Sequence, residues 1–292
     1  MSPLRTLLLA AFAVTVAACD SSDDPVTNSA PFPPTASLQV LHASSDAPAV
    51  NVVVNGNALL SGVDYKQGSA RLQLEPGTYS VQVDGITPGG DVTVIGPVDL
   101  TFDVDTVYTV AAVGKVGDGT IEAVVLNQPR TAVAAGSARA FVLHGASEAP
   151  TVDVYVTTPG ADLTAAAPLG SFSYKESLGP VEVAAGDYQI RVTLAGDPTA
   201  VVYDTGTITL NDGDDLLLSA INNTDAANTT LMQASPISLA VLTGAGTAEI
   251  LDASTPARLR VVHASADAPN VDVIVDDAVT LVSDLAFPDA TP

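Results

Sequence analysis

The sequence predicts an all-β protein built from tandem antiparallel β-sandwich modules, and three observations lead to this prediction. First, apolar residues alternate with other residues over short runs, as at Val50, Val52 and Val54, which is the period of a strand with one buried face. Second, glycine, asparagine and aspartate separate these runs, in segments such as "VNGNA" and "GKVGDGT", and these residues favour turns. Third, no run of helical periodicity exceeds two turns, and only "GADLTAAAPLG", from Gly160, is expected to form a short helical turn.

A nine-residue motif occurs three times in the chain. It reads "VLHASSDAP" at 40–48, "VLHGASEAP" at 142–150 and "VVHASADAP" at 261–269. Further along, "LQLEPGTYSVQV" at 72–83 matches "VEVAAGDYQIRV" at 181–192. Internal similarity at this spacing indicates repeated structural modules.

The repeats predict the domain boundaries. Module 1 is expected over 36–129, module 2 over 137–253, and an incomplete third module over 256–292, which lacks a counterpart of "EPGTYSVQV". About seven short strands per ~100 residues is immunoglobulin-like or transthyretin-like in outline. The chain has no tryptophan and no cysteine pair, which argues against a true immunoglobulin domain. Two or three strands cannot close a sandwich, so residues 256–292 are expected to be loosely structured or, as the less favoured alternative, to extend an edge of module 2.

The N-terminus has the order of an export signal over residues 1–18. Arg5 precedes an apolar run that ends at Ala18, and this run is too short for a bilayer, which needs ~20 residues. It leads into "VAAC", where Cys19 is the chain's only cysteine. This segment resembles the lipobox of bacterial lipoproteins, in which the cysteine is diacylated and the signal is cut just before it. Cleavage by ordinary signal peptidase is the alternative.

Composition limits the partners. Residues 19–35 comprise the cysteine and a stretch rich in serine, aspartate and proline, which predicts a flexible tether. The whole chain has 33 acidic and 10 basic residues and a net charge of −23. Such a charge argues against nucleic acid or anionic lipid headgroups as partners.

Each copy of the motif holds one of the three histidines of the chain. Each histidine shares a strand face with the apolar residues two and four positions before it, so it is expected at the core-side end of a strand. We interpret it as a structural brace, in which one ring nitrogen donates to a carbonyl and the other accepts from a serine or a backbone N–H. The acidic residue of the motif is expected to reach the ring or to cap amides of its own loop, and the proline to fix the start of the next strand. The predicted structural motif comprises His42, Asp46, Pro48, His144, Glu148, Pro150, His263, Asp267 and Pro269.

Two chemical interpretations of the histidines are weaker. A metal site usually has three or four ligands, whereas each module offers one histidine and one nearby carboxylate. A catalytic dyad would pair His42 with Ser44 or Ser45, but the corresponding positions carry Ala146 in the second copy and Ala266 in the third. The sequence therefore predicts no catalytic residue, no metal ligand and no cofactor, with weak metal or ligand contact as the remaining alternative.

Two further features have a structural interpretation. The run "NDGDD" at 211–215 lacks the ligand spacing of an EF-hand loop and predicts a turn between strands. Tyr79 and Tyr188 share a face with apolar residues, so we expect core rings whose hydroxyls bond to the backbone, as in a tyrosine corner.

The segment "LRVVHASADAPNVDVIVDD", together with the earlier "PGTYSVQV", resembles the bacterial domain-of-unknown-function family 4397. Members of that family are exported or lipid-anchored, often with tandem copies of the domain. The resemblance implies an extracytoplasmic β-sandwich and brings no established activity.

Two functions remain open on these grounds. The favoured one is a lipid-anchored protein of the bacterial cell envelope, on the extracytoplasmic side of a membrane, with a binding or structural role. Its expected partners are the membrane, through the anchor, and envelope proteins or glycans. The alternative is an envelope hydrolase acting on surface polymers, although we expect the protein not to be an enzyme.

Overall fold

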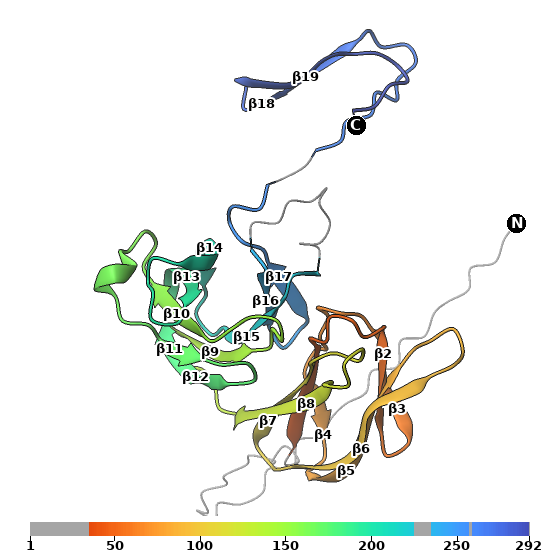
Figure 1. Ribbon diagram of the computed structural model, residues 1–292, viewed down its shortest axis with the longest axis vertical. Helices are drawn as coiled ribbons and strands as arrows, with labels where there is room; N and C mark the ends of the chain where they lie inside the picture. Colours follow the sequence, from red (N-terminus) through yellow and green to blue (C-terminus); the bar gives the residue numbers. More distant parts are fainter. Residues whose placement is uncertain (1–34, 225–234, 257–258, 292) are drawn as a thin grey trace, which may run out of the picture. The chain divides into compact units, whose positions relative to one another are not determined.

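The computed structural model describes residues 35–224, 235–256 and 259–291. Strands dominate this part of the chain (Figure 1). Its one helical element is the 3₁₀ turn η1 (Leu163–Ala165), which lies within the predicted "GADLTAAAPLG" segment. The predicted all-β class is therefore confirmed. No helix among the described residues is long and apolar enough to cross a membrane. The predicted signal peptide at 1–18, Cys19 and the tether up to residue 34 lie outside the described residues.

The first sandwich consists of eight strands in two sheets. The strands are β1 (Ala36–His42), β2 (Val50–Val54), β3 (Asn57–Val63), β4 (Leu72–Leu74), β5 (Gly77–Gly85), β6 (Val92–Phe102), β7 (Thr106–Val113) and β8 (Glu122–Pro129). One sheet has the order β4-β1-β7-β8 and the other β3-β2-β5-β6. Between them lies an apolar core that includes Leu38, Val52, Val81 and Phe102. The alternating valines of β2 bury one face of that strand, as the sequence predicts.

The second sandwich repeats this arrangement and adds one edge strand. Its strands are β9 (Ser137–His144), β10 (Val152–Thr157), β11 (Gly170–Phe172), β12 (Ser177–Ala184), β13 (Gly186–Leu194), β14 (Val201–Leu210), β15 (Asp215–Asn222), β16 (Ile237–Leu242) and β17 (Thr247–Ile250). The sheets are β12-β9-β15-β16-β17 and β11-β10-β13-β14. Val154, Ile190, Tyr203 and Leu218 belong to the core between them.

The sheets are antiparallel except at one place in each sandwich. β1 pairs with β7 in parallel, and β9 pairs with β15 in parallel, which the sequence analysis did not predict. Parallel neighbours require a long crossover connection. Here strands β2 to β6 supply the connection in the first sandwich, and β10 to β14 supply it in the second.

A third apolar cluster joins the two sandwiches, and we call it the joint core. All seven residues of β1 are buried, because one face of the strand packs in the first sandwich and the other contacts the second. The joint core comprises Leu41, Ala43, Ala111, Val113 and Leu126 from the first sandwich and Leu143, Leu217, Ile221, Ala240 and Leu242 from the second. The two sandwiches are therefore joined by buried apolar side chains as well as by their linker.

The third repeat contains a hairpin of β18 (Val271–Val275) and β19 (Val279–Leu285). These two strands form a two-stranded sheet of their own, so they add to no sheet of the second sandwich. A single bridge between Val262 and Ala290 closes the segment around the third histidine. Backbone pairing in this hairpin extends from Val271 to Leu285.

Candidate functional site

The three histidine loops share one hydrogen bond. In each, the ring Nε2 lies 3.0 to 3.1 Å from the carbonyl oxygen of the motif proline, and the pairs are His42 with Pro48, His144 with Pro150 and His263 with Pro269. A carbonyl oxygen can only accept, so Nε2 carries the hydrogen. The expected bond from a ring nitrogen to a carbonyl is thus present in every copy. It ties the end of one strand to the residue that leads into the next.

An aromatic ring completes each brace. It meets the edge or face of the histidine in a T-shaped contact, with ring centroids 6.0 to 6.4 Å apart, and the pairs are His42 with Tyr65, His144 with Tyr174 and His263 with Phe287. All three imidazoles are buried. The alignment of Phe287 with Tyr65 is visible in the sequence, and the structure gives the aligned residues the same contact.

The environment of His42 favours the neutral ring. Its Nδ1 accepts from the backbone N–H of Ser44 at 3.3 Å while its Nε2 donates to Pro48. Burial lowers the pKa of His42 below its ordinary value, and the Pro48 bond and the charge of Asp64 oppose this effect only in part. Both ring nitrogens of this histidine are therefore engaged within its own loop. The Nδ1 atoms of His144 and His263, by contrast, have no hydrogen-bond partner among the described residues, so the second predicted bond is present only in the first copy. The hydroxyl of Ser44 is buried and makes no hydrogen bond to any described residue, so these two side chains form no nucleophile and base pair.

The acidic residues of the motif do not contact their histidines, which corrects the expectation for them. Asp46 accepts hydrogen bonds from the amides of Val116 and Gly117, at 2.7 and 2.8 Å, in the loop between β7 and β8. It therefore caps a distant loop, because the parallel pairing of β1 and β7 brings their ends together. Glu148 forms an ion pair with Lys115 of the first sandwich. Only Asp267 stays within its own loop, where it accepts from Ser265.

The first two motif loops meet at one end of the joint core. A Cβ on Gly145 would lie 3.8 Å from the Cβ of Ala43, so the backbones of the two loops approach closely. The Asn222 amide donates to the hydroxyls of both Ser45 and Ser147, at 3.2 and 2.9 Å. One asparagine at the end of β15 thus links two serines that occupy the same position in the two repeats.

Ion pairs surround the joint core. The chain has three lysines, and every one pairs with a glutamate of the other sandwich: Lys66 with Glu249, Lys115 with Glu148 and Lys175 with Glu122. In a chain with 33 acidic residues and so few cations, this placement offsets repulsion between two acidic bodies where they come closest.

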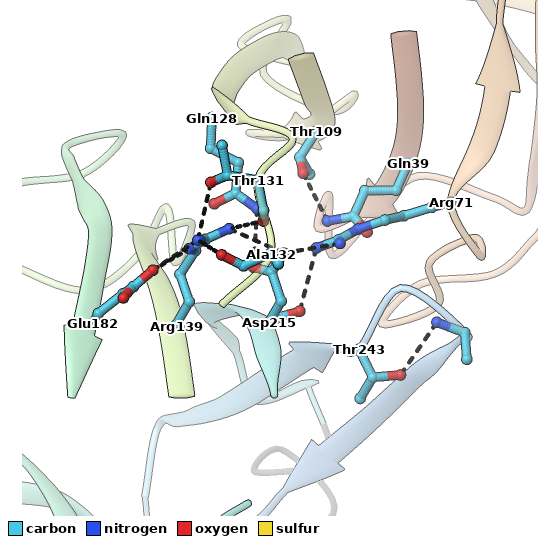
Figure 2. A network of polar contacts seen from close by, with 11 residues as sticks. Gln39, Arg71, Thr109, Gln128, Thr131, Ala132, Arg139, Glu182, Asp215 and Thr243 are labelled. Atoms are coloured by element: carbon cyan, nitrogen blue, oxygen red, sulfur yellow. Dashed lines mark hydrogen bonds and ion pairs between the residues drawn. The ribbon is translucent and has the colours of Figure 1, made fainter. Parts of the chain in front are cut away.

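A polar network lies beside the joint core, and Figure 2 shows its side chains converging on Asp215. Arg71 Nη1 lies 2.9 Å from one carboxylate oxygen of Asp215, and Gln128 Nε2 donates to the other at 3.0 Å. Both partners come from the first sandwich. Arg139 lies 3.8 Å from the same carboxylate and pairs with Glu182 at 2.7 Å. The network therefore links the first sandwich to the second through polar contacts beside the joint core.

The linker between the sandwiches is held by the same arginine. Arg139 donates to the carbonyls of Thr131 and Ala132, at 2.9 and 3.1 Å. These two residues lie between the predicted module 1 (36–129) and module 2 (137–253). The connection is thus bound to the second sandwich by hydrogen bonds.

Sequence reasoning missed the joint, although a signal for it exists. The runs "DLLLSAIN" in β15 and "ISLAVL" in β16 do not alternate, and a strand buried on both faces reads as a continuous apolar run. Nothing local marks Asp215, and the run "NDGDD" predicts a turn at this position. The "NDGDD" turn itself is present, with the Asp214 amide donating to the Asn211 carbonyl, but its last residue begins β15 and enters the network.

The structure also describes the two tyrosines and the acidic groups that the sequence singles out. The hydroxyls of Tyr79 and Tyr188 donate to backbone carbonyls four residues upstream, at Glu75 and Ala184, both at 2.8 Å, which confirms the tyrosine-corner prediction. Within residues 35–224, 235–256 and 259–291, no group of three or more histidine, cysteine, aspartate or glutamate residues is arranged to hold a metal ion.

These observations define a class of protein: tandem all-β sandwiches with a repeated histidine brace. The sequence profile of one family, described as a domain of unknown function (DUF4397), matches the chain twice, at residues 36–155 and 142–238. The two matches together span more than half of the 292 residues. The chain belongs to the DUF4397 family and carries tandem copies of its domain. No curated protein matches it.

Proposed function

We propose that this protein is a lipid-anchored component of the bacterial cell envelope, in which tandem β-sandwich modules have a binding or structural role outside the cytoplasm. One observation carries this proposal: the repeated polar motif is used to build and join modules. The histidines brace loops, while Ser45 and Glu148 make contacts between the sandwiches, and Ser147 binds the same asparagine as Ser45. The most distinctive polar residues of the chain thus contribute to a rigid body.

The joint core gives this body a mechanical property that suits the role. Two sandwiches joined only by a linker would move independently. Here Leu41 and Leu143, both 0% exposed, lie in one apolar cluster that spans the two. The pair then acts as a single stiff unit that presents its outer loops and sheet edges at a fixed spacing. Envelope proteins or glycans that bind through such loops and edges are the proposed partners.

The anchor is part of the same proposal. Cys19 is the chain's only cysteine and follows directly on the export signal, the position at which bacterial lipoproteins are acylated. Acyl chains contribute ~0.8 kcal/mol per buried CH₂, so two or more of them hold a protein firmly on a membrane. The tether then keeps an acidic body away from anionic headgroups. An envelope hydrolase is not proposed, since all three histidines are buried and the Nε2 of each is bonded to the proline carbonyl of its own loop.

The test is membrane fractionation of cells that express the full chain, combined with metabolic labelling by a palmitate analogue. We expect label and a membrane location for the wild type and for Ser21→Ala, a matched change two residues away. The Cys19→Ala variant should carry no label and should be released or remain as an uncleaved precursor. A Cys19→Ala protein that loses its signal and still sediments with membranes would contradict the anchor.

A further inference from the structure

A small cavity lies between the two sandwiches, beside the joint core and the polar network. The space in it that is available to the centre of a water molecule is about 10 Å³. The second sandwich lines it with the apolar side chains of β9 and β15, and the first sandwich lines it largely with polar ones. The lining includes Phe141, Leu216 and Leu217 from the second sandwich and Gln39, Arg71, Thr109 and Gln128 from the first.

Two polar groups that line this cavity are incompletely paired within the protein. Gln39 is 1% exposed. Its amide nitrogen donates to Thr109 Oγ1 at 2.8 Å, but its buried carbonyl oxygen makes no hydrogen bond to any described residue. Arg71 binds Asp215 through Nη1 and Nη2, at 2.9 and 3.2 Å, while its buried Nε has no partner among the described residues. Buried polar groups are normally hydrogen-bonded, so the cavity presents one acceptor and one donor in need of a partner.

These two groups select the chemistry of the ligand. The Nε–H of Arg71 requires a species with a lone pair, and the carbonyl oxygen of Gln39 requires one with a polar hydrogen. Water has both. An ammonium or metal ion has no lone pair and would be repelled by the guanidinium, and a halide has no hydrogen to donate. The size agrees, because a cavity needs about 10–15 Å³ of such space to hold one water molecule.

A larger cavity in the second sandwich has the opposite character. About 40 Å³ is available there to the centre of a water molecule, and His144 is the one polar residue among those that line it. A bound water needs about two to four polar partners, and apolar cavities stay dry. The polar lining, more than the size, therefore singles out the cavity at the joint.

We propose that the cavity at the joint is a binding site for one water molecule, which accepts a hydrogen bond from Arg71 Nε and donates one to Gln39 Oε1. The water holds the guanidinium from the side of Nε, and the two Nη atoms are then directed at Asp215 of the second sandwich (Figure 2). It is thus a component of the network that links the sandwiches. The site is independent of the acyl anchor and of the function proposed above.

The first test is a high-resolution crystal structure of the full chain carrying Cys19→Ala. We expect the density of one water at about 2.7–3.2 Å from both Arg71 Nε and Gln39 Oε1. Crystals soaked in rubidium bromide should show no anomalous signal at this position. The proposal is overturned by a cavity without density, by a direct bond between Arg71 Nε and Gln39 Oε1, or by an anomalous peak, which would show an ion in the place of the water.

The second test detects the water in solution by NMR. The Nε–H of Arg71 should give a rotating-frame cross-peak to the water resonance with the sign of a dipolar contact, which differs from that of proton exchange. The Nε–H of Arg139, which donates to Glu182 at 3.1 Å, should give none. Gln39→Met removes the acceptor at similar length and should abolish the Arg71 cross-peak. The matched change Gln73→Met, at an exposed position of the neighbouring strand β4, should leave it intact.

The wild-type side chains settle the matter even where Gln39→Met does not fold. A wild-type Arg71 Nε–H without the dipolar cross-peak would contradict a bound water. A cross-peak that a folded Gln39→Met protein retains at full intensity would contradict the proposed site, because the water would then be held by other groups.

Discussion

The first two repeats and the third share one loop geometry but differ in what surrounds it. In all three, a histidine donates to a proline carbonyl six residues later and meets an aromatic ring. In the first two, the adjacent Leu41 and Leu143 are fully buried in the joint core, whereas the corresponding Val262 is mostly exposed. The brace is thus a local property of the motif, while burial of the residue before the histidine depends on the strands packed around it, which in the first two repeats come from its own module and from the other sandwich. Substitutions at equivalent positions separate these two contributions.

The largest difference in the free energy of unfolding is expected between equivalent substitutions in the joint core and in the third repeat. Leu143→Ala removes a fully buried side chain and should lower the free energy of unfolding by roughly 2–5 kcal/mol, the usual cost of such a cavity. The equivalent change Val262→Ala removes an exposed side chain and should change it by less than about 0.5 kcal/mol. Chemical denaturation followed by tyrosine fluorescence measures both. Equal effects of the two substitutions would show that Leu143 gains nothing from the joint core around it.

Removal of a brace should have the next largest effect. His144→Ala leaves the Pro150 carbonyl without its donor, and we expect a loss of about 1–3 kcal/mol in the free energy of unfolding of the paired sandwiches. The equivalent His263→Ala should not alter that transition, because the third repeat forms a sheet of its own. A chelator should leave the melting temperature of the wild type unchanged. A large shift on addition of EDTA would instead reveal a metal at the loop.

The pH dependence should follow the burial of His42. Its pKa in the folded protein is lowered, chiefly by desolvation, so the unfolded chain binds its proton more readily than the folded one. The stability from the neutral ring is therefore complete above the unfolded pKa of about 6.5, and it is lost as the pH falls from there toward the folded value. Denaturation midpoints between pH 7.5 and 5 measure this loss. His42→Asn should make the denaturation midpoint less dependent on pH in this range. An unchanged dependence would mean that the titration of His42 is not its cause.

The ion pairs around the joint should contribute least. Lys66 and Lys175 occupy equivalent positions in the two repeats and pair across the joint in opposite directions. Partly exposed pairs contribute about 0.2–1 kcal/mol, so Lys66→Met should cost less than about 1 kcal/mol and the cost should shrink in high salt. Comparison of unfolding at low and high ionic strength tests this. A cost that salt does not reduce would point to lost packing instead of lost charge.

Local features were predictable from the sequence, and long-range ones were not. The strand of Val50, Val52 and Val54 and the bond from His42 to a nearby carbonyl follow from the period of the residues and from donors a few positions apart. The parallel pairing of β1 with β7 joins residues about 70 positions apart, and no local pattern encodes it. Asp46 illustrates the consequence, since the amides that it caps lie in a loop that only this pairing brings near.

The joint core could likewise be predicted only in part from the sequence. The absence of alternation in β15 and β16 indicates strands buried on both faces, yet it does not say what covers the second face. Arg71 and Asp215 lie 144 positions apart and only become partners once the two sandwiches meet. The repeated motif could be located from the sequence, but its part in joining modules depends on this tertiary contact.

Differential scanning calorimetry of the full chain and of two joint variants tests the central claim, that the first two sandwiches form one cooperative body. We expect a single transition for the paired sandwiches, with equal calorimetric and van't Hoff enthalpies. Leu41→Ala in the first sandwich and Leu143→Ala in the second should each shift that whole transition downward. Two separate transitions, each moved only by the substitution in its own sandwich, would contradict a shared joint core.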